Sequence, residues 1–299
     1  MLLRSFLLIT FIFISGCSHR SVPHTSIIQQ APSIQKIQTR SVGLFSQIKV
    51  TGHLDVNLRS GFKKPILILK GDPRDLAKLS TINDNGFLKI QLDNTAPRFG
   101  PVSMEIRAGH LSSFEYRGSG SIKGMHLNSN ALDLFINNSG RTVLGGNINV
   151  RTLKIKGSGY TEIQGIYGYS SAIILSGRSR VQLTGVANLT NIDMSGESWL
   201  SMHWVKSYNL KIRARDHTLI QLAGIAEKMD VELWGYAHFN GRFLRVKNIF
   251  AKTHDRSLAE ITSTNKQHTL ATDASDIYFY PAPKMKTDFM AYDGAVLRF

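Results

Sequence analysis

Residues 153–165 read Leu-Lys-Ile-Lys-Gly-Ser-Gly-Tyr-Thr-Glu-Ile-Gln-Gly, and this stretch decides the fold. Apolar Leu153 and Ile155 alternate with Lys154 and Lys156, which is the two-residue period of a half-buried strand. The Gly-Ser-Gly that follows tolerates positive φ and ends the strand in a tight turn. A second short strand then begins, so the stretch predicts a strand, a turn and a strand.

The same pattern recurs through the C-terminal two thirds of the chain. Related strands begin at residues 153, 173, 192, 210, 231, 249 and 270, spaced by 18–21 residues. A repeat near 20 residues made of strands and turns is typical of a solenoid. Since connections between parallel strands are right-handed, we expect an all-β, right-handed parallel β-helix. Four inward-facing pairs are predicted: Leu153/Ile155, Ile192/Met194, Leu210/Ile212 and Val231/Leu233.

An antiparallel sandwich is the alternative fold, but the repeat is longer than one strand and one turn. The rungs are expected over residues 113–299. Residues 42–112 are rich in strands but lack the 20-residue spacing, so we expect them to cap the N-terminal end of the stack. Within this cap, Asn85-Gly86 predicts a hairpin turn, and residues 73–79 predict one short helical turn.

The order of these motifs resembles the bacterial head GIN domain family of auto-transporter adhesins over residues 42–225. The motifs that carry the resemblance are Phe45-Ser-Gln-Ile-Lys-Val-Thr-Gly, Leu54-Asp-Val-Asn-Leu, Ile66-Leu-Ile-Leu-Lys-Gly-Asp, Asn85-Gly-Phe-Leu-Lys-Ile and the Gly-Ser-Gly rungs. They are structural turns and strands, so the resemblance implies a fold and an adhesive role but no catalytic residue. Because no membrane-barrel translocator follows the rungs, membrane attachment is expected from the N-terminus.

The N-terminal segment has the layout of a lipoprotein signal. Arg4 precedes an apolar run at 6–14, which is too short to span a bilayer and fits a secretory signal peptide over residues 1–16. The lone cysteine, Cys17, follows Ile-Ser-Gly, which resembles the bacterial lipobox and implies lipidation of its thiol. Ser18 in place of Asp points to the outer membrane, and residues 17–41 are expected to form a flexible tether. An ordinary buried cysteine behind a signal peptide is the alternative.

The net charge of +15 suits an acidic partner, but the basic residues are spread thinly. The densest cluster is Lys211-Ile-Arg213-Ala-Arg215. A diffuse charge favours loose surface attraction over a site that reads nucleic acid. The expected partners are therefore the bacterial membrane, through the lipid, and an acidic polysaccharide or an envelope protein.

The rungs around residues 178–242 combine several arginines with the densest aromatic residues of the chain. Aromatic side chains can stack on sugar rings, and guanidinium groups can hold acidic groups. Aromatic residues also fill β-helix interiors, so an interior position is the alternative for some of them. The predicted ligand-binding residues are Arg178, Arg180, Trp199, Arg213, Arg215, Trp234 and Tyr236.

Three acidic residues suggest a different kind of site. Glu197 and Asp216 lie one rung apart, and Asp255 lies two rungs further on. Stacked carboxylates perform glycoside hydrolysis or hold a cation in other proteins. These residues occupy the turn positions and have arginines beside them, so solvated turns with local ion pairs are the expectation and no catalytic residue is predicted.

Two other patterns carry no chemistry in this interpretation. The Gly-x-Gly pairs at 118/120 and 157/159 precede no helix, so they predict turns and not a phosphate loop. His217, His238 and His254 lack metal-ligand spacing, so neither a metal nor a cofactor is expected. The sequence predicts a non-enzymatic envelope lipoprotein for adhesion or scaffolding. A polysaccharide lyase or hydrolase, and a periplasmic partner in envelope assembly, are the alternatives.

Overall fold

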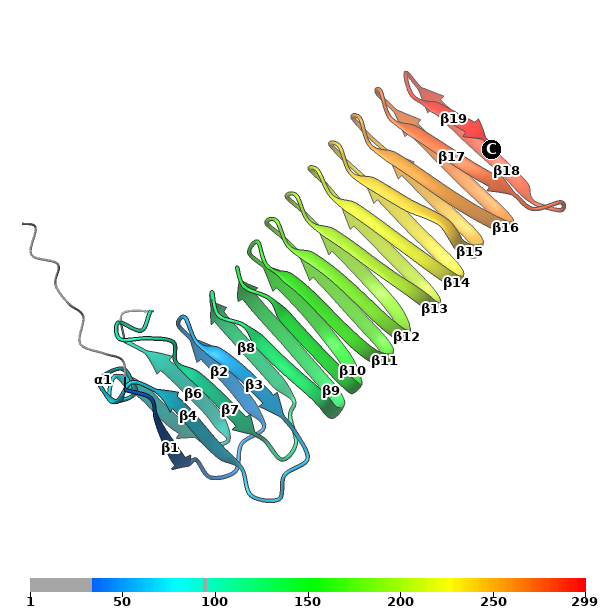
Figure 1. The fold of residues 1–299 in the computed structure, drawn as a ribbon. Coiled ribbons are helices and arrows are strands. Elements are labelled where there is room, and N and C mark those ends of the chain that lie inside the picture. Colours follow the sequence, from blue (N-terminus) through cyan, green and yellow to red (C-terminus); the bar gives the residue numbers. More distant parts are fainter. Residues whose placement is uncertain (1–33, 94–95) are drawn as a thin grey trace, which may run out of the picture. The chain divides into compact units, whose positions relative to one another are not determined.

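The computed structural model describes residues 34–93 and 96–299. This part of the chain is nearly all-β and forms a β-solenoid of about 9 turns with about 20 residues per rung. Its strands join one 19-stranded sheet that winds along the stack (Figure 1). The all-β solenoid and the 20-residue repeat predicted from the sequence are confirmed.

Eight long, bent strands of 15–17 residues form the central rungs. Each pairs in parallel with the next through both its N-terminal and its C-terminal half. They are β9 (Ile122–Asn138), β10 (Thr142–Lys156), β11 (Tyr160–Leu175), β12 (Arg180–Met194), β13 (Trp199–Ala214), β14 (Leu219–Leu233), β15 (His238–Thr253) and β16 (Leu258–Thr272).

Three shorter strands continue the ladders beyond β16. β17 and β19 extend the ladder of the N-terminal halves, and β18 extends that of the C-terminal halves. Their bounds are Asp276–Pro281 for β17, Lys286–Tyr292 for β18 and Ala295–Arg298 for β19.

The stack has two opposite edges, a turn edge and a bend edge (Figure 1). The turn edge consists of the tight turns between successive long strands. Its positive-φ residues are Gly157, Gly177, Gly196, Asp216, Gly235 and Asp255. The bend edge consists of the bends in the middle of each long strand. Its positive-φ residues are His126, Gly146, Gly165, Gly185, Trp204 and Gly224.

The interior between the two ladders is apolar. All eight residues of the four predicted inward pairs are buried, with at most 2% of any side chain exposed. Ile212, for example, lies in register between Ile192 and Val231 of the neighbouring rungs. The predicted inward columns are therefore confirmed, and burial of this apolar column is what holds the rungs together.

The N-terminal strands stack out of sequence order. The rung made by β2 and β3 lies between the rung of β6 and β7 on one side and that of β8 and β9 on the other. Antiparallel β1, β4 and β5 close this end of the sheet. The bounds are β1 (Lys36–Ser41), β2 (Gln47–Thr51), β3 (Asp55–Arg59), β4 (Ile66–Gly71), β5 (Leu79–Asp84), β6 (Phe87–Leu92), β7 (Ser103–Arg107) and β8 (Ser113–Gly118).

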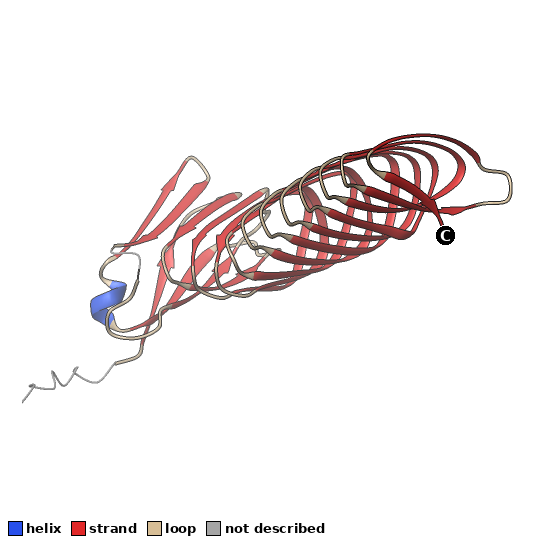
Figure 2. Cartoon of the chain, turned by 90° about the horizontal axis from the view of Figure 1, so that it is seen from above, coloured by secondary structure: helices blue, strands red, loops and turns tan. Residues whose placement is uncertain are grey.

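The hairpin turn and the short helical turn predicted in this region are both present. β5 and β6 form a hairpin in which Asn85 and Gly86 both have positive φ, as a type I′ turn requires. The expected helical turn is α1 (Pro73–Leu76), seen at the cap end of the stack in Figure 2. Asp72 caps α1 by accepting the backbone N–H of Arg74 at 3.0 Å. The Arg74 guanidinium also hydrogen-bonds the carboxylate and holds the pKa of Asp72 well below its usual range.

Residues 36–41 differ from the expectation of a tether, because they form strand β1. This strand is exposed along nearly its whole length, so no apolar alternation marks it in the sequence. Its backbone pairs antiparallel with β4, and the guanidinium of Arg40 donates to the carbonyl oxygens of Leu79 at 2.6 Å and Leu76 at 3.0 Å. Backbone pairing and one arginine thus hold a segment whose side chains predict no strand.

The expected signal peptide, Cys17 and most of the expected tether fall outside the described residues. Within residues 34–93 and 96–299, no helix has the length and apolar character needed to cross a membrane.

Candidate binding surface

The acidic residues of the turn edge hold neighbouring rungs together. Asp216 and Asp255 both adopt positive φ, and each carboxylate accepts a backbone N–H from the preceding rung. Gly196 donates to Asp216 and Gly235 donates to Asp255, both at 2.8 Å. These carboxylates are engaged by the fold, in agreement with the expectation of structural turns.

Glu197 takes part in a different row along the same edge. Its carboxylate pairs with Arg178 at 3.1 Å, and one rung further on the His217 ring stacks on Tyr236 with centroids 4.7 Å apart. Arg256 then donates to the Tyr236 hydroxyl at 3.1 Å. We call Arg178, Glu197, His217, Tyr236 and Arg256 the turn-edge row. Along it, two charged groups, two stacked rings and a further guanidinium follow one another on successive rungs.

The three histidines do not converge. His217 belongs to the turn-edge row, whereas His238 pairs with Glu260 at 2.9 Å and His254 stacks on Trp234 with centroids 5.7 Å apart. No group of three potential metal ligands occurs in the part of the chain that the structure describes.

The structure brings only some of the predicted ligand-binding residues together. Arg180 and Trp199 are register partners on the outer face just after the turn, and Trp234 and Tyr236 lie in one turn. Arg213 and Arg215 lie on the other outer face, just before the turn. The seven residues thus surround the turn edge on three adjacent strips.

Several of these arginines are already paired. Arg213 contacts both Asp230 and Glu232 at 3.1 Å, and Arg215 contacts Asp193 at 3.6 Å. Arg180 makes no ion pair with any residue of 34–93 or 96–299. The Arg215–Asp193 pair is solvent-exposed and competes weakly with an incoming acidic ligand, whereas Arg213 is half-buried and held by two carboxylates.

The opposite edge carries an apolar surface that the sequence analysis did not select. Six large apolar side chains from β11 to β15 are between 47% and 83% exposed there. We call them the bend-edge strip: Tyr169, Val186, Trp204, Tyr208, Ile225 and Phe243.

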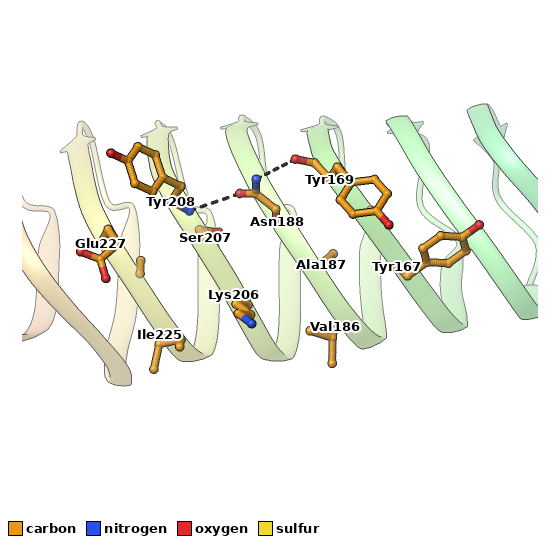
Figure 3. A pocket seen from close by; sticks show the side chains of 12 residues that line it. Tyr167, Tyr169, Val186, Ala187, Asn188, Lys206, Ser207, Tyr208, Ile225 and Glu227 are labelled. Atoms are coloured by element: carbon orange, nitrogen blue, oxygen red, sulfur yellow. Dashed lines mark hydrogen bonds between the residues drawn. The ribbon is translucent and has the colours of Figure 1, made fainter.

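Two adjoining hollows of about 560 Å³ each lie along this strip. They share Val186, Lys206 and Ile225. Figure 3 shows the first hollow, where the Asn188 side chain donates to the Tyr169 carbonyl at 2.6 Å and accepts the Tyr208 N–H at 3.3 Å. One amide therefore fixes the backbone that carries two exposed tyrosines.

Polarity is inverted at the bend edge. Ser171 and Ser207 are buried while their neighbours Tyr169 and Tyr208 are exposed. The buried hydroxyls are satisfied across rungs, since Ser171 donates to the Val150 carbonyl at 2.7 Å and Ser207 accepts the Leu189 N–H at 3.1 Å. The signal in the sequence was an aromatic residue where the neighbouring rungs place the bend glycine, as at Trp204.

The fold and these two edges define a β-solenoid that presents exposed side chains along its length. Residues 44–188 match the family described as "Putative auto-transporter adhesin, head GIN domain". The head GIN domain is therefore assigned to residues 44–188, a segment that ends within β12 and is shorter than the expected 42–225. Members of an adhesin-like family are envelope- or surface-associated proteins.

Solved structures support the same fold. A structure described as a putative adhesin from Parabacteroides distasonis is 15% identical, with a TM-score of 0.50 over 89% of this chain and 97% of that one. Another putative adhesin, from Parabacteroides merdae, is 11% identical, with a TM-score of 0.50 over 89% and 96%. At such identities the likeness shows the fold alone. No curated protein matches the sequence.

Proposed function

We propose that this protein is a non-enzymatic lipoprotein of the bacterial outer membrane whose turn edge binds an acidic polysaccharide. The turn-edge row carries the proposal. Its exposed guanidinium groups and stacked rings lie on successive rungs, so they offer a linear polymer a row of contacts along the stack. The adhesin family supports a binding role, and the use of Asp216 and Asp255 by the turns argues against catalysis.

The lipid anchor gives the first prediction. Replacing Cys17 with Ser removes the thiol that a lipid would modify, so the protein should leave the membrane fraction. The measurement is the distribution between pellet and supernatant after a carbonate wash of the membranes. Retention of the variant in the washed pellet would contradict the anchor.

The polysaccharide site gives the second prediction. Changing Arg178, Arg180, Arg213 and Arg215 together to Ser should weaken binding of polygalacturonate by the full chain in detergent roughly tenfold or more, since each exposed ion pair contributes about 0.2–1 kcal/mol. Binding by the unaltered chain should weaken as salt rises, because exposed charges are screened. Stacking should leave an affinity that salt does not remove.

A matched variant keeps this test specific. Changing the exposed Lys63, Lys64, Lys154 and Lys156 to Ser removes the same charge away from the predicted residues and should leave most of the binding intact. Equal loss in both variants would mean that only net charge matters. Breakdown of the polysaccharide, abolished by Glu197→Gln or Asp216→Asn, would favour the enzyme alternative.

A further inference from the structure

The bend-edge strip is unusual for a surface in contact with water. Tyr169, Trp204 and Phe243 are each at least 70% exposed, and with Val186, Tyr208 and Ile225 they protrude near the bends of five consecutive long strands, β11 to β15. Trp204 also has a φ of +67°, a conformation that is strained for a bulky side chain. Contiguous exposed apolar residues of this kind mark interaction surfaces.

Two basic residues, Lys206 and Arg245, and one histidine lie among the polar residues around the strip. His203, Lys206 and Arg245 line the two hollows, and neither Lys206 nor Arg245 forms an ion pair with a residue in the described ranges. Among the described residues that line the hollows, Glu227 is the only acidic one. Its carboxylate is paired with Lys247 at 3.3 Å. The edge thus offers apolar rings and free positive charge together.

We propose that the bend edge lies on the surface of an anionic lipid bilayer. The rings of Tyr169, Trp204 and Tyr208 would occupy the headgroup region, where aromatic residues with a polar end are favoured, and the apolar ring of Phe243 would insert beside them. Lys206 and Arg245 would extend their charged ends to lipid phosphates while their aliphatic stems stay against the strip.

The geometry favours a flat surface over a polymer or a compact protein. The exposed side chains come from five consecutive rungs on one edge of the stack, so a flat surface lying along that edge can contact the whole strip. Most of each ring here is exposed, so the rings are free to enter a lipid surface. The cations select the anionic lipid surface over a neutral one.

This inference goes beyond the proposed function and does not depend on it. Because the bend edge and the turn edge lie on opposite sides of the stack (Figure 1), a solenoid resting on its bend edge holds the turn-edge row away from the lipid. If polysaccharide binding at the turn edge fails its test, the proposed membrane contact still stands. If the membrane contact fails its test, the proposed polysaccharide site still stands.

The three tryptophans provide the test. The full chain, with its anchor as the cell makes it, is reconstituted in vesicles of phosphatidylcholine and phosphatidylglycerol. One variant retains only Trp204 (Trp199→Phe, Trp234→Phe), and its matched control retains only Trp234 on the turn edge (Trp199→Phe, Trp204→Phe). Acyl chains brominated near the headgroup quench any tryptophan that enters the bilayer surface.

Trp204 should lose most of its emission on brominated lipid, and Trp234 should lose little. Equal quenching of the two variants, or an unquenched Trp204, would overturn the proposal. In the chain with all three tryptophans, quenching should rise with phosphatidylglycerol and fall when Lys206→Glu and Arg245→Glu are introduced together. Quenching that responds neither to phosphatidylglycerol nor to the two Glu substitutions would also overturn the proposal. A shift of Trp204 emission by polygalacturonate in the absence of lipid would overturn it as well.

Discussion

Replacing Ile212 with Asp should lower the free energy of unfolding by about 4 kcal/mol or more, because it places an unpaired carboxylate in the apolar interior. The Ile212 side chain is fully buried between Ile192 and Val231 of adjacent rungs. The measurement is urea unfolding of the full chain in detergent, followed by far-ultraviolet circular dichroism and by tryptophan emission.

The neighbouring residue supplies the control. Lys211 is exposed on the outer face of the same strand, so Lys211→Asp should change the unfolding free energy by less than about 0.5 kcal/mol. An unchanged unfolding midpoint for Ile212→Asp would contradict the inward column, and a spectrum dominated by helix would contradict the fold.

Replacing Gly165 with Ala should cost about 3 kcal/mol or more, from two effects that add at this bend. The φ of +74° is strained for a residue with a Cβ, and that Cβ would overlap the carbonyl oxygen of Gly146 in the preceding rung. Relief requires moving β10 away from β11, which breaks their parallel pairing.

Gly86→Ala isolates the first effect. Gly86 has a similar φ of +85° in the β5–β6 hairpin, but an added Cβ meets no atom of the described structure within 4 Å. Its cost should be about 1 kcal/mol, from backbone strain alone. Unfolding midpoints of the two variants provide the comparison, and an equal effect would mean that close approach of the rungs is unimportant at the bend.

The repeat and the inward columns could be predicted because strand periodicity and rung spacing both appear directly in the sequence. Leu153 and Ile155 alternate with lysines, and the next rung repeats this about 20 residues later. The same spacing explains two ion pairs of the predicted ligand residues. Glu197 follows Arg178 by one rung, and Glu232 follows Arg213 by one rung, so each pair becomes adjacent when the rungs stack.

The stacking order of the cap could not be predicted from the sequence. β2 and β3 form a rung that later segments flank on both sides, so strands that follow each other in the chain are not always neighbours in the sheet. Strand alternation reports which side chains are buried but not which strand pairs with which. β1 was missed for a related reason, since an exposed edge strand has no buried face to produce alternation.

The bend edge was missed because its pattern contradicts the rule used to assign the interior. Tyr208 and Ser207 are exposed and buried respectively, the reverse of what their hydrophobicity predicts. The hydrogen bond between Ser207 and Leu189 of the adjacent rung explains why a hydroxyl is favourable inside. Packing of the interior alone therefore does not account for the exposed position of Tyr208.

The central claim is that the two edges serve different contacts, and it can be tested on a single preparation. Polygalacturonate is titrated onto the vesicle-bound single-tryptophan variants, and the emission of Trp234 and Trp204 is recorded. We predict that the polysaccharide shifts the emission of Trp234 on the turn edge, while Trp204 stays quenched by brominated lipid. A polysaccharide that instead displaces Trp204 from the lipid, with Trp234 unaffected, would contradict the assignment of both edges.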